Sequence, residues 1–176
     1  MNRCGCWSGW LDTPLTEKGR EDAVQAGKII ANTTFDRIYA SDLSRARSTA
    51  ELALPGCSYI VDPTVREINV GSISGKPLGA VRDSNNQPLN KDGYAAFGGE
   101  SNAQFRLRIE GFMKRIQQEN CENIAVFSHG GVLRKFLEIT MGMPLPRSAV
   151  ICRNCAVAVF EVDNGLWMMH SWINLY

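Results

Sequence analysis

The sequence predicts an α/β domain of three layers, an α/β/α sandwich in which helices cover both faces of a mainly parallel sheet. Segments of strand length alternate with segments of helical periodicity along the chain. One apolar segment, which begins at residue 123, delivers His129 to a glycine turn, and a helical pattern follows at once. The 176 residues suit a single domain, residues 1–176, with one core.

The expected elements follow from these patterns. Residues 64–99 lack sustained periodicity and are rich in Gly, Pro, Asn and Asp, which predicts a long excursion over one end of the sheet. Long irregular segments in compact domains are often functional. Asn164-Gly165 between two alternating runs predicts a hairpin over residues 156–173. Helices are expected at 17–31, 43–54, 101–118 and 132–141, and strands at 36–40, 58–61 and from 123.

Charge and hydropathy exclude several classes of partner. Nineteen basic and eighteen acidic residues give a net charge of +1, so no global field attracts nucleic acid or anionic lipid. No apolar run approaches the ~20 residues that a membrane-spanning helix needs. A chain of this length with 44% hydrophobic residues needs no disulfide framework, so its cysteines are expected as thiols in the cytoplasm. Composition leaves the oligomeric state open.

The spacing of the cysteines allows one alternative. Cys4-x-Cys6 and Cys152-x-x-Cys155 could together supply four thiolates to zinc. Neither pair has the usual zinc-ribbon context, and the second pair runs directly into a strand pattern. The sequence therefore favours ordinary thiols, and no metal site is expected.

Three residues are candidates for phosphate chemistry. His129 is expected at a strand tip beside the free N–H groups of a helix N-terminus, which favours anions. Arg45 is expected in the first turn of a helix after another strand, and its planar fork suits phosphate. Glu67 in the excursion could act as a general acid if a phosphate or poor solvation raised its pKa. Taken singly, these residues could also be a core histidine, a solvated arginine and a surface partner of Arg66.

Other phosphate and hydrolase motifs do not fit. Residues 71–77 are similar to a P-loop but are one residue short, and Pro77 stands where Ser or Thr must bind magnesium. The cysteine–five–arginine spacing of thiol phosphatases does not occur, and neither does a G-x-S-x-G or H-E-x-x-H motif.

Taken together, the segments occur in the order and approximate spacing of one family. The chain resembles the histidine phosphatase superfamily of phosphoglycerate-mutase-like proteins, and especially its small phosphatase branch, which includes α-ribazole phosphatases. The resemblance runs from Asn2 to about Asn174. Its most specific pieces are residues 9–16 with Gly19-Arg20, Ser41-Asp42-Leu43 with Arg45-Ala46 and Thr49-Ala50, and Ser128-His129-Gly130-Gly131.

The resemblance implies hydrolysis of small phosphorylated metabolites through a phosphohistidine, with inorganic phosphate as a ligand and with no metal or other cofactor. Arg45 would then hold the phosphate, and His129 would donate to its oxygens as charge builds in the transition state. Glu67 would protonate the leaving oxygen and help to activate water. Positioning and electrostatic stabilisation are the main tasks of a protein in such a reaction.

The resemblance also implies further phosphate and substrate contacts, and it leaves one part of the pattern unmatched. Asn2 matches an asparagine that contacts phosphate, and Ser8 and Gly9 would line the substrate side. The nucleophile of the family belongs to an Arg-His-Gly segment at the end of the first central strand, which should lie shortly before Asn2, where this chain has Met1. The second histidine, His170, is a poor substitute because it falls on the closing hairpin.

Three explanations remain open at this point. The natural protein would extend upstream with an apolar strand ending in Arg-His-Gly, or the chain would be a non-catalytic phosphate-binding or regulatory protein, or an enzyme with an unrecognised nucleophile. A phosphoglycerate mutase-type phosphotransferase is a further alternative, less favoured because the mutase branch usually carries a longer insertion than residues 64–99 offer. Ile73-Ser74, where the family often has Trp-Glu, leaves the substrate pocket open.

Overall fold

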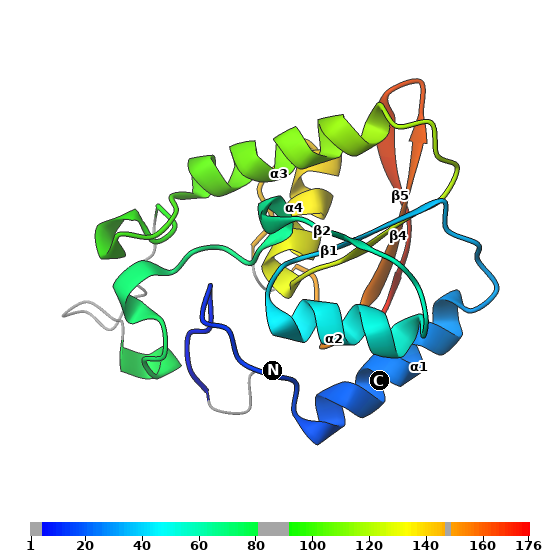
Figure 1. Cartoon of the computed structure of the whole chain (residues 1–176). Coiled ribbons are helices and arrows are strands. Elements are labelled where there is room, and N and C mark those ends of the chain that lie inside the picture. Colours follow the sequence, from blue (N-terminus) through cyan, green and yellow to red (C-terminus); the bar gives the residue numbers. More distant parts are fainter. Residues whose placement is uncertain (1–4, 81–91, 147–148) are drawn as a thin grey trace.

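The structure of the chain, a computed structural model, describes residues 5–80, 92–146 and 149–176. Helices and strands alternate through these residues (Figure 1). The α-helices are α1 (Glu17–Ile30), α2 (Ser44–Ala53), α3 (Asn102–Gln117) and α4 (Gly130–Thr140). The strands are β1 (Arg37–Ala40), β2 (Ile60–Val61), β3 (Ile124–Phe127), β4 (Val157–Asp163) and β5 (Leu166–Ile173). Short 3-10 helices occupy the excursion: η1 (Pro63–Val65), η2 (Gly71–Ile73), η3 (Leu78–Ala80) and η4 (Ala95–Phe97).

Local side-chain contacts fix the starts of two helices. The Thr16 hydroxyl caps α1 by accepting from the Gly19 amide at 3.1 Å. A capping box opens α3, in which Ser101 and Gln104 each accept from the other's backbone N–H. The start of α4 differs from the sequence expectation, because the helix begins directly after its N-cap, His129, and includes both following glycines.

The sheet is parallel, as expected. Strand β1 pairs in parallel with β2 on one side and with β3 on the other, in the order β2-β1-β3. Helices α3 and α4 lie on one face of this sheet, and α1 and α2 lie on the other (Figure 1). The expected α/β fold with a parallel sheet is therefore confirmed. Strand β3 is an edge strand of the described sheet, and the first central strand implied by the resemblance stays a prediction.

The closing hairpin forms a second sheet. Strands β4 and β5 are antiparallel and pair only with each other among the strands that the structure describes. Asn164 and Gly165 in the turn have φ values of 47° and 83°, the left-handed conformations that a two-residue hairpin turn favours. Phe160 and Trp167 hold the hairpin against α4, with ring centroids 5.7 and 5.9 Å from that of Phe136.

A large core cluster lies between the sheet and α3 with α4. Phe112 belongs to this cluster, and its ring meets Tyr39 of β1 edge-on at 5.5 Å and Phe136 of α4 at 6.2 Å. Because these contacts join two helices to the middle strand, the cluster fixes the distance between two layers. The buried members of the cluster are Tyr39, Val65, Phe105, Ile109, Phe112, Met113, Ile116, Val132 and Phe136.

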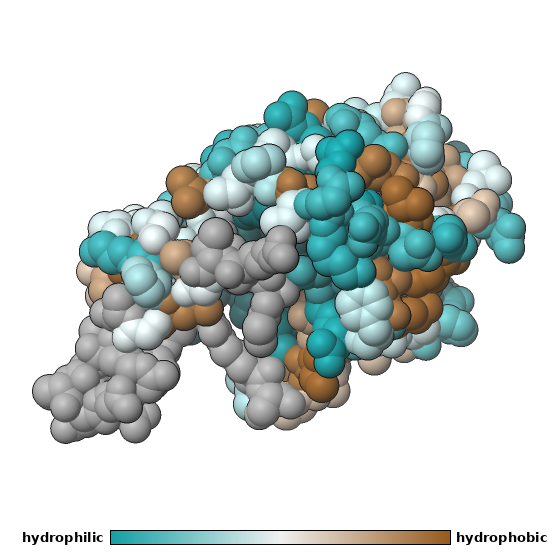
Figure 2. Space-filling view, turned by 90° about the horizontal axis from the view of Figure 1, so that it is seen from below, coloured by the Kyte–Doolittle hydropathy of each residue, from teal (hydrophilic) through white to brown (hydrophobic). Residues whose placement is uncertain are grey.

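Apolar side chains remain on the surface of the hairpin, where Leu166 is 70% exposed and Met168 is 44% exposed. Figure 2 shows apolar side chains gathered at the right of the view from below, the side on which α1 and the hairpin lie. This exposure follows from the separation of the hairpin, since a two-stranded sheet covers little of its own surface.

Every helix in the described ranges is too short or too polar to span a bilayer.

Truncation of Phe112 should measure the contribution of this cluster. We expect Phe112→Ala to lower the free energy of unfolding by about 3–5 kcal/mol, because the side chain is 1% exposed and its loss leaves a cavity. Leu107→Ala on the same helix is the control, since Leu107 is 72% exposed and should change stability by less than about 0.5 kcal/mol. Urea unfolding of both variants makes the comparison, and similar losses would contradict the assignment of the core.

Candidate active site

The parallel pairing of β1 and β3 brings two distant residues into contact. The two strands run side by side in register, with Ala40 opposite Phe127, so they end at the same edge of the sheet. His129 follows β3, and Arg45 lies in the first turn of α2, which follows β1. The Nε of Arg45 donates to the Nδ1 of His129 at 3.2 Å. Two sequence-predicted site residues therefore touch.

Both ring nitrogens of His129 are engaged. Since the Arg45 Nε–H can only donate, the His129 Nδ1 must accept, and the ring proton lies on Nε2. Nε2 lies 2.9 Å from the hydroxyl of Ser41, which accepts from it. Burial is the main cause that lowers the pKa of His129 to about 3, and the charges of Arg45 and Arg108 lower it further, while Asp42 opposes them. The ring is therefore neutral at pH 7.

Arg45 also joins the N-terminal loop to this edge. Its two terminal nitrogens donate to the carbonyl oxygens of Leu11 at 2.8 Å and Gly9 at 2.9 Å. Burial lowers the pKa of the guanidinium, while Glu67 and Asp12 raise it, and an arginine keeps its charge at physiological pH. Each terminal nitrogen carries two N–H groups, so among the described residues one on each is left for a further acceptor.

Glu67 joins the excursion to the N-terminus of α4. Its carboxylate accepts from the amide of Ile68 at 2.8 Å and from the amide of Gly131 at 3.1 Å. A Cβ on Gly131 would lie only 2.0 Å from the Glu67 Oε1. The second glycine of the Ser-His-Gly-Gly segment therefore leaves the space that the carboxylate occupies, a role that the sequence analysis did not assign.

Arg66 has a different partner from the one considered in the sequence analysis. Its guanidinium forms a two-pronged ion pair with Asp42, with the Arg66 Nε 2.7 Å from the Asp42 Oδ1. Its face also stacks on Trp10 at 4.7 Å, and the Trp10 indole N–H donates to the Glu67 carbonyl at 2.7 Å. The alternative of a Glu67–Arg66 surface pair is therefore wrong, because the guanidinium of Arg66 pairs with Asp42 instead.

The other predicted residues have different positions. Asn2 lies outside the described residues. Ser8 belongs to the turn next to Gly9, and its carbonyl accepts from the Leu11 amide at 2.7 Å. Gly9 reaches the site through the carbonyl that binds Arg45. His170 is exposed on β5 of the hairpin.

Sequence reasoning missed Ser41, which is fully buried and contacts His129. With Arg45 bound to Nδ1, the pair does not have the arrangement of a Ser–His nucleophile and base, because the ring donates its proton toward Ser41 and has no lone pair facing it. The one available signal was the position of Ser41 directly after β1, at the same edge as His129. Within the described ranges no group of three or more His, Cys, Asp or Glu side chains could hold a metal ion.

Comparison with known proteins gives the family of this arrangement. The sequence model of the histidine phosphatase superfamily (branch 1) matches residues 1–175. The chain is 29% identical to the adenosylcobalamin/alpha-ribazole phosphatase of Salmonella typhimurium, over 94% of this chain and 82% of that protein. It is also 29% identical to the protein named "Probable phosphoglycerate mutase GpmB" of Erwinia tasmaniensis, over 94% of this chain and 81% of that protein.

A solved structure agrees with the sequence relatives. The crystal structure of phosphoglycerate mutase from Thermus thermophilus has a TM-score of 0.74 and 29% identity, over 99% of this chain and 92% of that chain. The chain belongs to the histidine phosphatase superfamily, as the resemblance implied. Membership of this family supports a phosphatase-type function.

The low pKa of His129 predicts a loss of stability in acid. The folded pKa of about 3 lies below the ordinary value of 6.5, so between these values the unfolded chain binds the extra proton. The contribution of His129 to the free energy of unfolding is therefore fully present above pH 6.5. It is lost as the pH falls, by about 2 kcal/mol between pH 7 and pH 5. His129→Gln keeps a donor and an acceptor but does not titrate, so it should lack this part of the loss. Urea unfolding at both pH values tests this, and equal losses in the two proteins would refute it.

Proposed function

We propose that the protein is a phosphomonoesterase that acts on small phosphorylated metabolites through a phosphohistidine intermediate. The observation that carries this proposal is the contact of Arg45 with His129 at the N-terminus of α4. A fixed cation, a neutral imidazole and the N-terminus of a helix converge at one edge of the sheet, and Glu67 reaches the same N-terminus. Such a cluster suits a phosphoryl group, whose transfer depends mainly on positioning and charge stabilisation.

Arg45 and His129 bind the phosphoryl oxygens in this proposal. The Ser41 hydroxyl both donates and accepts, so it can serve either tautomer of the ring. When a phosphoryl oxygen replaces Arg45 beside Nδ1, the ring proton lies on Nδ1 and points at that oxygen, while Ser41 donates to Nε2. Arg45 then directs its N–H groups at the other oxygens. The neutral ring is supported by the low pKa of His129.

Glu67 transfers the proton in this proposal. When the nucleophilic nitrogen attacks phosphorus, the ester P–O bond breaks and the leaving oxygen takes the proton of Glu67. Water then attacks the phosphohistidine, the P–N bond breaks, and the Glu67 carboxylate takes the proton of that water. Inorganic phosphate leaves, and the enzyme regains its starting state.

The nucleophilic histidine lies outside these 176 residues in this proposal. His129 uses both nitrogens in polar contacts, and His170 is exposed on the hairpin. No strand in the described part of the chain pairs with the outer edge of β3. This supports a further strand at that edge, because a strand parallel to β3 would end beside His129. We place the enzyme in the cytoplasm, which is supported by the free thiols of Cys57, Cys121, Cys152 and Cys155.

Phosphate release tests the proposal. The purified 176-residue chain is compared with a version extended by the in-frame codons upstream of Met1, with p-nitrophenyl phosphate as substrate. We expect the extended protein to turn over and to form an acid-labile phosphoenzyme, and the 176-residue chain to bind inorganic phosphate without turnover.

Other outcomes of this comparison distinguish the alternatives. Turnover by the 176-residue chain that depends on His170 would contradict the proposal that the nucleophilic histidine lies outside these residues. Upstream stop codons, together with binding but no turnover, would identify a phosphate-binding protein. Transfer of the phosphoryl group to phosphoglycerate rather than to water would identify a mutase.

Replacement of Glu67 separates its proton transfer from simple binding. In the active protein, Glu67→Gln should reduce kcat/KM at least ~100-fold for glycerol phosphate, whose alkoxide leaves only when protonated. The loss for p-nitrophenyl phosphate should be much smaller, because its phenolate leaves without a proton. Steady-state kinetics on both substrates make the test, and equal losses would exclude Glu67 as the proton donor.

A further inference from the structure

The segment that carries Glu67 has little regular structure of its own. Glu67 lies between η1 and η2, in a stretch without α-helix or strand. Backbone carbonyls in such a stretch need partners from elsewhere in the fold. The position of the Glu67 carboxylate therefore depends on side chains that bind the backbone around it.

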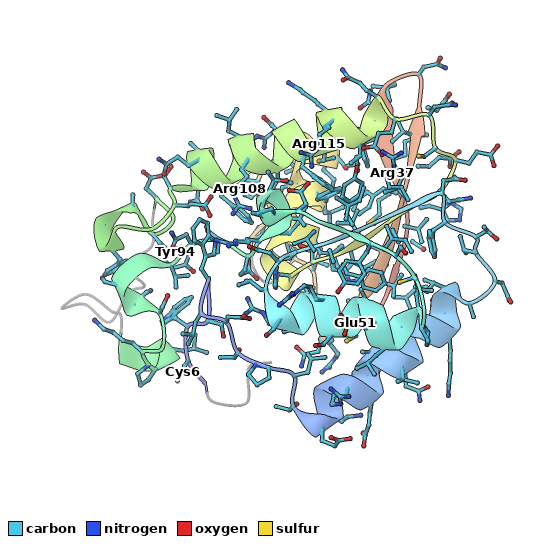
Figure 3. The ribbon with its side chains drawn as sticks, in the orientation of Figure 1. Cys6, Arg37, Glu51, Tyr94, Arg108 and Arg115 are labelled. Carbon is cyan, nitrogen blue, oxygen red and sulfur yellow. The ribbon has the colours of Figure 1, made fainter. Side chains whose placement is uncertain are left out.

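Arg108 supplies most of these partners from α3. Its guanidinium donates to the carbonyls of Thr64 at 2.8 Å, Arg66 at 2.9 Å and Glu67 at 3.2 Å. Figure 3 shows Arg108 on the side of α3 that faces the sheet and the excursion. Three carbonyls within four residues are thus held by one planar group, which fixes the path of the chain through Glu67.

Glu100 completes the set of partners of Arg108. Its two carboxylate oxygens accept from the Nε and a terminal nitrogen of Arg108, both at 2.7 Å. All five N–H groups of the guanidinium are thereby used. Glu100 also accepts from the amide of Asn69 at 2.8 Å, so the same ion pair holds the chain on the far side of Glu67. The two side chains are only 16% and 15% exposed.

We propose that Arg108, oriented by Glu100, is a positioning residue that holds the Glu67 carboxylate against the Gly131 amide at the N-terminus of α4. Arg108 reaches the site through the backbone of residues 64–67. The inference rests on the proposed function, since the reaction gives the position of Glu67 its importance.

Two further observations support this role. The positive charge of Arg108 also lowers the pKa of His129, so it lies close enough to act on both sides of the site. Glu67 offers its carbonyl to Trp10 as well as to Arg108, so the backbone at Glu67 is held from two directions. Lysine cannot replace Arg108 here, because an ammonium group has three donors and no planar fork.

The amide resonance of Gly131 reports the position of Glu67 without any need for turnover. In two-dimensional ¹H–¹⁵N NMR of the full chain, the Glu67→Gln variant is the reference: it gives the chemical shift of the Gly131 amide without the carboxylate. We expect Arg108→Lys, which keeps the charge, to shift the Gly131 resonance from its native position toward that reference. Glu100→Gln should shift it in the same direction, because it removes the ion pair that orients Arg108.

Arg106→Lys is the matched control. Arg106 lies on the same helix and pairs with Glu110 one turn away, at 2.7 Å. Within the described residues it forms no hydrogen bond or ion pair with the segment around Glu67. It should leave the Gly131 resonance unchanged. A native Gly131 resonance in folded Arg108→Lys and Glu100→Gln would overturn the inference. Failure of both variants to fold would overturn it as well, since the pair would then serve stability alone.

Kinetics of the active protein separate this inference from the proposed function. Arg108→Lys should reduce kcat/KM for glycerol phosphate about 10-fold to 100-fold more than for p-nitrophenyl phosphate. When Glu67→Gln is already present, adding Arg108→Lys should lower kcat/KM for the two substrates by the same factor. If Glu67→Gln itself shows no preference, the proton-donor role fails while the NMR result still decides the positioning role. Equal losses for both substrates in Arg108→Lys, where Glu67→Gln does discriminate, would count against Arg108.

Discussion

The parallel pairing of β1 with β3 is the constraint on which the candidate site depends. Because both strands point in the same direction and pair in register, the residues that follow them emerge at one edge of the sheet. Ser41 and Arg45 follow one strand, and His129 follows the other. The contact between Arg45 and His129 therefore needs no special loop conformation. It results from the same backbone hydrogen bonds that pair β1 with β3.

The electrostatics of the site follow from this arrangement. A histidine between a guanidinium and a buried hydroxyl stays neutral, since a second positive charge there would be both poorly solvated and repelled by Arg45. The carboxyl side chains lie around this centre: Glu67 meets the N-terminus of α4, and Asp42 pairs with Arg66. Because Glu67 and Asp42 each bind a donor of their own, neither neutralises Arg45 by direct pairing. Arg45 therefore keeps its attraction for an anion.

The excursion that carries Glu67 is held differently from the layers. The layers are joined by aromatic and aliphatic contacts around Phe112, which tolerate small shifts. The path through Glu67 is fixed by hydrogen bonds from Arg108 and Trp10, whose geometry is narrow. An apolar core thus supports a loop whose direction is set by a few polar side chains.

The sequence by itself determined what local chemistry controls. The cap at Thr16, the capping box at Ser101 and the turn at Asn164-Gly165 each act within a few residues, and the turn was predicted from the chain. The family motifs also predicted that Arg45, Glu67 and His129 belong together. Only the tertiary structure decided the partners across long separations: Ser41 on His129, Asp42 on Arg66, Arg108 on the excursion and the separation of the hairpin from the sheet. The physical reason is that each of these contacts depends on the packing of elements that the spacing of residues along the chain does not specify.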